Sequence, residues 1–195
     1  YLYMQNIFFL KEVLAYLDKN VSLVILNQKQ LKQGLDFTLN TILSQNKKSA
    51  ILINLSTPIE EITQKIAPLF IDRIKIIDAF SKEASNLKNV ITVNNSSDLT
   101  GIQIAIEKAQ NQLSGEKIII IDALNVLSIY NKKEIIGKFL HLFSNKTRLQ
   151  NNSALIFCIK ESTDAEILEM AKEFSDKVYD YSDLFASTIT LAESR

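Results

Sequence analysis

GEKIIIIDALNVLSIYN, residues 115 to 131, is the stretch that decides the fold class of this chain. Strand-forming residues run from Lys117 to Ile121, and Asp122 follows directly. A buried strand that delivers a carboxylate at its C-terminal end is how nucleotide-hydrolysing α/β proteins present the acidic group for Mg²⁺. The stretch therefore raises the question whether the chain also has the phosphate-binding loop that such an aspartate serves.

The composition indicates one domain with no strong electrostatic preference. The chain has 195 residues, of which 47% are hydrophobic, so we expect one core and a single domain over residues 1–195. Lysine plus arginine and aspartate plus glutamate both number 22, which makes the formal net charge zero. Without a basic stripe, a nucleic-acid partner is not favoured.

The lone cysteine and the lone histidine argue against disulfide and metal chemistry. Cys158 lies in an apolar run and has no second cysteine to pair with, which fits a reducing, cytoplasmic location. His141 has no neighbour at metal-ligand spacing, so we expect no metal site and place this residue on a helix surface.

The N-terminal stretch YLYMQNIFFLKEVLAYL is apolar but interrupted by polar side chains. It falls short of the roughly 18 uninterrupted apolar residues that mark a membrane span, and it lacks the pattern of a signal peptide. We expect residues 1–18 to form a packed helix and the protein to have no membrane partner. Because the chain opens on Tyr1, a piece of a longer protein is also consistent with the sequence.

Short apolar runs alternate with amphipathic segments along the chain. The expected strands are residues 22–26, 49–55, 73–78, 90–93, 117–122 and 153–159, with a short last strand at 176–181. The expected helices cover residues 31–45, 58–70, 96–113, 132–150 and 163–174. This alternation predicts a three-layer α/β/α fold with a mostly parallel central sheet, in which the first strand and the Asp122 strand lie near the centre.

Sheets of this kind bind ligands beyond the carboxyl ends of their strands. The residues expected at that edge are Asn27, Gln28, Ser56, Thr57, Asp78, Asn94, Asn95, Asp122 and Glu161.

The order of these elements resembles the KaiC/RadA-type branch of the RecA-superfamily ATPases. The segments that carry the resemblance are NLSTP, IDALNVLSIYN and FLHLFSNKTRL, within a similarity that spans roughly residues 20–181. More narrowly, the chain is similar to archaeal KaiC-like domains of signal transduction. The resemblance implies a RecA-like P-loop fold, puts Asp122 at the Walker B aspartate, and puts Pro58 just after the position of the catalytic glutamate.

The stretch at the expected phosphate-binding loop, NQKQLKQGLDF, departs from the family pattern. A working loop needs several glycines, a lysine for the β- and γ-phosphates, and a Ser or Thr hydroxyl on Mg²⁺. If Gly34 is the last loop glycine, Leu35 replaces the lysine and Asp36 replaces the hydroxyl residue. Asp36 would then place a carboxylate at a helix N-terminus, where a phosphate would otherwise bind. None of the chain's 4 glycines gives Walker A spacing elsewhere.

The catalytic acid is also missing from the sequence. The family's acidic pair at the end of the second strand corresponds here to Leu55 and Ser56, and neither can act as a base. We interpret the chain as a pseudo-ATPase whose degenerate nucleotide site comprises Gly34, Leu35, Asp36 and Asp122, with no catalytic residue. ATP and Mg²⁺ are not favoured as cofactors.

Several residues keep more than one interpretation. Asp122 is a metal ligand, a cap of the following helix, or a hydrogen-bond acceptor for the end of a neighbouring strand, and Asp78 has the same ambiguity. Lys29 and Lys32 either contact a phosphate or are solvated, and Arg148 either neutralises a helix C-terminus or reaches another subunit.

We considered a phosphoacceptor receiver domain and rejected it, because Leu26 and Asn27 stand where receivers need an acidic pair. Two functional hypotheses remain. The favoured one is a regulatory or scaffolding module that binds a protein partner or its own copies. The other is a sensor that binds ATP without efficient hydrolysis.

Overall fold

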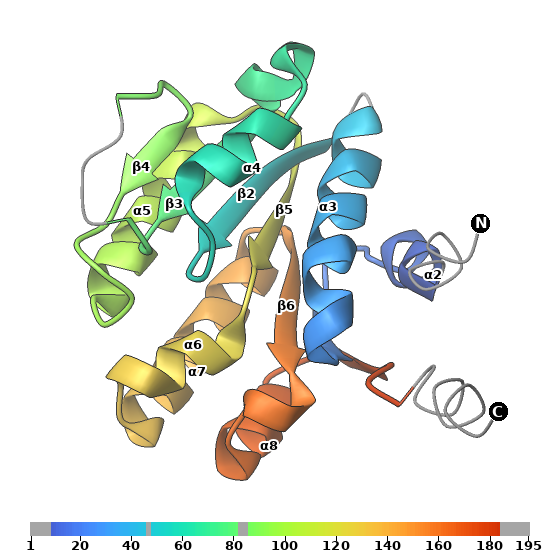
Figure 1. Cartoon of the computed structure of the whole chain (residues 1–195), viewed down its shortest axis with the longest axis vertical. Coiled ribbons are helices and arrows are strands. Elements are labelled where there is room, and N and C mark those ends of the chain that lie inside the picture. The colour runs from blue at the N-terminus through green and yellow to red at the C-terminus, as the bar shows by residue number, and fades with distance from the viewer. Residues whose placement is uncertain (1–8, 46–47, 82–85, 184–195) are drawn as a thin grey trace, which may run out of the picture.

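A parallel sheet of seven strands forms the centre of the molecule (Figure 1). The computed structural model describes residues 9–45, 48–81 and 86–183. The strand order is β4-β3-β2-β5-β6-β1-β7, and every neighbouring pair is parallel. The strands are β1 Val21–Leu26, β2 Lys48–Asn54, β3 Ile74–Asp78, β4 Val90–Thr92, β5 Glu116–Ile121, β6 Ser153–Ile159 and β7 Lys177–Asp180.

Helices cover both faces of this sheet, as the predicted three-layer fold requires (Figure 1). One face packs against α2 (Phe9–Ala15), α3 (Gln28–Ser44) and α4 (Ile59–Lys65). The other packs against α5 (Leu99–Gln112), α6 (Leu124–Tyr130), α7 (Lys133–Leu149) and α8 (Ala165–Glu173). The α/β class and the parallel sheet are confirmed.

The isoleucine run of β5 shows why the strands are continuously apolar. Successive side chains of a strand point to opposite faces, so a strand covered on both sides needs apolar residues at every position. Ile119 and Ile121 enter the core beneath α5 and α7, whereas Ile118 and Ile120 enter the core beneath α3.

The position of β1 differs from the prediction. It shares a sheet with β5, as expected, but β6 lies between them and only β7 lies beyond β1. β5 is central, and the expectation that β1 is also central was wrong. The short strand β7 is alternately half-buried and exposed, the pattern of an edge strand, and it adds little width beyond β1.

The helices also differ from the prediction in two places. The helix expected over residues 58–70 ends at Lys65, and a 3₁₀ helix, η1 (Pro68–Arg73), follows. Pro68 explains the break, because proline donates no backbone hydrogen bond and disfavours helical geometry in the residue before it. Helix α6 was not expected at all.

The expected N-terminal helix is present as α2, which packs against α3, while residues 1–8 of that prediction lie outside the described residues. Within the described ranges no helix is long and apolar enough to cross a membrane.

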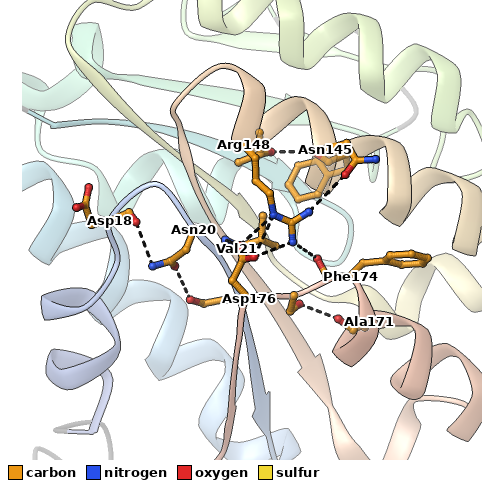
Figure 2. Close-up of polar contacts among 12 residues, drawn as sticks. Asp18, Asn20, Val21, Asn145, Arg148, Ala171, Phe174 and Asp176 are labelled. Carbon is orange, nitrogen blue, oxygen red and sulfur yellow. Dashed lines mark hydrogen bonds and ion pairs between the residues drawn. The ribbon is translucent and has the colours of Figure 1, made fainter.

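An ion pair fastens the edge strand to the helices at the amino ends of β1 and β7 (Figure 2). The Nε of Arg148 lies 3.1 Å and 3.2 Å from the two carboxylate oxygens of Asp176, and its Nη2 donates to the Phe174 carbonyl at 2.8 Å. Asp176 Oδ2 also accepts the backbone N–H of Val21 at 2.8 Å. Arg148 therefore makes its contacts inside the chain, near the C-terminus of α7.

Candidate functional site

The junction between β1 and α3 is the first element of the candidate site. The strand ends at Leu26 and the helix begins at Gln28, so Asn27 alone joins them. The side-chain oxygen of Asn27 accepts the N–H groups of Lys29 and Gln30, both at 3.1 Å. The Gln30 side chain accepts the N–H of Asn27 at 2.9 Å, which completes a capping box.

This short junction corrects the expectation for Gly34. The residue was expected in a phosphate-binding loop, but it lies inside α3. A Cβ at this position would come within 3.2 Å of Leu10 Cδ1 and 3.3 Å of Leu26 Cδ1. The absence of a side chain thus serves the close packing of α2 and β1 against α3.

Asp36 was likewise expected at a helix N-terminus, and this prediction was wrong. It lies in the third turn of α3. Lys65 Nζ binds both of its carboxylate oxygens, at 2.8 Å and 3.0 Å. A second pair, Lys32 with Glu61 at 2.9 Å, joins the same two helices. Lys32 and Asp36, two of the charged residues expected near a phosphate, therefore form ion pairs between α3 and α4. Leu35 between them is 8% exposed and belongs to the core.

Asp122 directly follows β5 and lies at the carboxyl edge of the sheet, as the sequence predicted. Its Oδ1 accepts the N–H of Leu55 at 3.0 Å, and its Oδ2 accepts the hydroxyl of Ser56 at 2.8 Å. The side chain is only 1% exposed. Burial raises the pKa of Asp122 to about 6, although the hydrogen bonds from Ser56 and from the backbone N–H groups act in the opposite direction. The carboxylate thus fastens the end of β2 to the end of β5.

A cavity of about 380 Å³ lies beside these residues. This volume is within the ~300–1,000 Å³ range of ordinary ligand pockets. The lining residues come from α3, α4, the loop after β2, and the segment from Asp122 into α6: Gln28, Leu31, Lys32, Leu35, Asp36, Ser56, Thr57, Pro58, Glu61, Ile62, Lys65, Asp122, Ala123, Asn125, Val126 and Ile159.

The cavity thus brings together Leu35, Asp36 and Asp122 of the expected site residues, whereas Gly34 does not line it. Asp78 is also outside it. Its Oδ1 accepts from the Asn54 side chain at 2.9 Å and from the backbone of Phe80 at 3.1 Å.

Sequence reasoning missed the contributions of α4 and α6 to the site. Glu61 and Lys65 lie one turn apart on α4, and Asn125 and Val126 lie at the start of α6. The i, i+4 spacing of Glu61 and Lys65 indicates an ion pair within α4, but both residues pair with α3 instead. The sequence therefore carried no signal for either contribution.

Asp122 is the candidate metal ligand of the site. Both carboxylate oxygens of Asp122 already accept hydrogen bonds. The part of the chain that the structure describes contains no group of three or more His, Cys, Asp or Glu side chains arranged to hold a metal ion.

Comparison with known proteins finds solved structures of similar fold but no match in sequence. No protein-family model matches the chain. No curated protein matches it significantly. Among solved structures, the uncharacterized protein PH0321 from Pyrococcus horikoshii, solved in complex with an unknown peptide, superposes with a TM-score of 0.63 at 16% identity. That match covers 84% of this chain and 77% of PH0321.

Two further structures connect the fold to ATPases. The KaiC-like protein PH0186 from Pyrococcus horikoshii superposes with a TM-score of 0.59 at 8% identity, over 87% of this chain and 74% of that one. Another solved structure, an isolated ATPase domain, superposes with a TM-score of 0.55 at 13% identity, over 88% of this chain and 73% of that one. The chain therefore has the α/β fold that KaiC-like and RecA-like ATPase domains share.

Proposed function

We propose that this chain is a pseudo-ATPase, a domain with the fold of these ATPases that works as a regulatory or scaffolding module by binding protein. The resemblance noted in the sequence suggests a role in signal transduction, and the lone buried cysteine fits a cytoplasmic location. The observation that carries the proposal is the junction at Asn27. A phosphate-binding loop presents a series of free backbone N–H groups to the phosphates. Here one residue connects strand to helix, and its side chain occupies the N–H groups of Lys29 and Gln30.

The charges around the cavity also argue against a triphosphate. Its lining contains two lysines, Lys32 and Lys65, and three acids, Asp36, Glu61 and Asp122. Both lysines are already paired with acids at 2.9 Å and 2.8 Å. A nucleotide would thus enter a site without excess positive charge, next to a buried carboxylate. Losing several charge-assisted contacts of roughly 1.5–3 kcal/mol each reduces a micromolar affinity to the millimolar range or below.

Hydrolysis lacks a catalytic group as well. Leu55 and Ser56 occupy the positions where the family resemblance implies acids. The Leu55 side chain is buried, and the Ser56 hydroxyl donates to Asp122 at 2.8 Å. Neither residue can accept a proton from an attacking water at neutral pH.

A role in protein binding is supported by an exposed apolar stripe on α7. Ile135, Leu142 and Leu149 recur at every seventh residue and are 46%, 45% and 82% exposed. Residues at this spacing lie along one line of a helix. Exposed apolar patches commonly mark protein contacts. The structural relative PH0321 was solved in complex with a peptide, which is consistent with a peptide- or protein-binding role for this fold.

Calorimetry with Mg-ATP and Mg-ADP, together with an assay of phosphate release, tests the proposal. We expect no measurable hydrolysis and a dissociation constant in the millimolar range or weaker. Micromolar Mg-ATP affinity without hydrolysis would favour the alternative, a nucleotide sensor, for which the cavity beside Asp122 is the supporting observation. Phosphate release that disappears in Asp122→Ala would refute the pseudo-ATPase assignment.

A further inference from the structure

One charge in the cavity has no counterion. Lys32 is paired with Glu61 and Lys65 with Asp36, so these four charges cancel. Asp122 receives hydrogen bonds only from neutral donors, and no lysine or arginine in the described ranges forms an ion pair with it. At neutral pH the cavity therefore has an excess of one negative charge, located at its most buried polar group.

The uncharged part of the lining favours the same kind of ligand. The side-chain oxygen of Asn125 is buried and has no hydrogen-bond partner among the described residues. Ligands that donate hydrogen bonds can satisfy such an acceptor, whereas phosphates and carboxylates cannot. Among the other lining residues, Gln28, Ser56 and Thr57 are polar, and the apolar part of the wall consists of Leu31, Leu35, Pro58, Ile62, Ala123, Val126 and Ile159.

We propose that the cavity accepts the cationic side chain of a lysine or arginine presented by a partner protein. Long basic side chains have an apolar stem and a charged, donor-rich head. The stem would lie against the apolar wall and the head would approach Asp122. This inference rests on the proposed protein-binding function and names the chemistry that the partner must supply.

Energetics favours this ligand over an anion. A buried carboxylate without a counterion is costly, and a cation with hydrogen-bond donors offsets that cost directly. Repulsion from Lys32 and Lys65 opposes binding, but their side chains are 67% and 39% exposed, and solvent screens their charge. For a short peptide with few other contacts we expect a dissociation constant near ~1 mM.

Titrations followed by amide NMR provide the test. The probe is the blocked tripeptide acetyl-Ala-Arg-Ala-amide, and the matched control replaces arginine by citrulline, which has nearly the same shape but no charge. We expect saturable shifts at the amides of Ser56 and Ala123 with the arginine peptide, and at least about tenfold weaker binding of the citrulline peptide.

A variant pair locates the charge that is responsible. Asp122→Asn removes the charge and keeps an acceptor for the Leu55 N–H, so arginine binding should weaken at least about tenfold. Asp72→Asn makes the same change in net charge at an 80% exposed side chain and should leave binding unchanged. The dispersion of the amide spectrum verifies that both variants are folded.

Equal binding of the citrulline peptide, or an unaffected Asp122→Asn variant, would overturn this inference. No binding of the arginine peptide at about ten times the expected constant, ~10 mM, would do the same. If neither the arginine peptide nor Mg-ATP binds, only the proposed cationic ligand is rejected. The pseudo-ATPase proposal then still holds. Micromolar Mg-ATP affinity, in contrast, would overturn the proposed function itself.

Discussion

Asp122 is the buried acidic residue of the candidate site. Its carboxylate is buried, and no lysine or arginine among the described residues forms an ion pair with it. Its pKa of about 6 lies above the ordinary value of 3.8, which means that the folded state holds the proton more tightly than the unfolded chain does. Its contribution to stability is therefore complete below about pH 4 and is lost as the pH rises through about 6.

Asp122→Asn should consequently stabilise the protein at neutral pH. The amide oxygen can still accept the N–H of Leu55, and the hydroxyl of Ser56 can rotate to accept from the amide nitrogen. A shift of about two pKa units corresponds to an upper limit of about 3 kcal/mol. Urea unfolding of both proteins between about pH 4 and 8 should show a gain of about 1–3 kcal/mol near pH 7.5 that shrinks towards pH 4. A variant less stable at neutral pH, or a difference independent of pH, would contradict the buried-charge account.

Two contacts of Asp176 reinforce the backbone pairing that holds the edge strand β7 against β1. Asp176 accepts from the Arg148 guanidinium and from the Val21 N–H, so it links α7 to β1 at the start of β7 (Figure 2). Burial alone would raise the pKa of Asp176, but these hydrogen bonds and the charge of Arg148 outweigh it and lower the pKa. The resulting stabilisation is present above the ordinary pKa of 3.8 and is lost as the pH falls below it.

Arg148→Met should weaken the attachment of β7. Because both side chains are about one third exposed, at 34% and 38%, we expect a loss of only about 1–2 kcal/mol in urea unfolding at neutral pH. Hydrogen exchange of the β7 amides should accelerate more than that of β5. Lys172→Met is the control, because its i, i+3 pair with Glu169 is more exposed and worth less than about 0.5 kcal/mol. Equal effects of the two variants would show that the Arg148 network does not hold β7.

The elements also show which features of this fold a sequence can predict. Strands such as β6, which are apolar at nearly every position, can be recognised in the sequence. Because such strands are buried on both faces, nearly all of their residues must be apolar. Helix α6 was not predicted, because two of its seven residues, Ile129 and Tyr130, are apolar but exposed. They hide the alternation of apolar and polar residues by which a helix is recognised in a sequence.

The start of α3 was predictable in principle. Asn27 followed three residues later by Gln30 is the pattern of a capping box, and it would have placed the helix start before Gly34. The ion pairs between α3 and α4 were not predictable, because they depend on how the two helices approach each other in space.

At the scale of the whole molecule, the proposed scaffolding role requires a surface that meets another protein. The face formed by α5 and α7 is the best candidate. Lys146 pairs with Glu107 and Gln110 with Gln150 at 2.8 Å, so the two helices run side by side. The exposed Ile104 and Leu142 lie about one turn before the Lys146–Glu107 pair on their helices, which extends the apolar stripe of α7 towards α5.

A second copy of the chain can cover this stripe through a two-fold axis near Leu142, because Ile135 of one copy would then face Leu149 of the other. Such an interface uses the same patch on both subunits. We expect concentration-dependent self-association in sedimentation velocity, and we expect Leu142→Lys to weaken it at least about tenfold, since it places a charge at the centre of the contact.

Leu69→Lys changes a 74% exposed leucine on η1 and serves as the control that should leave association unchanged. Because both side chains are largely at the surface, neither variant should change the urea midpoint appreciably. If the unmodified chain stays monomeric up to millimolar concentration, the stripe does not pair with itself, and the scaffold must act through a different protein.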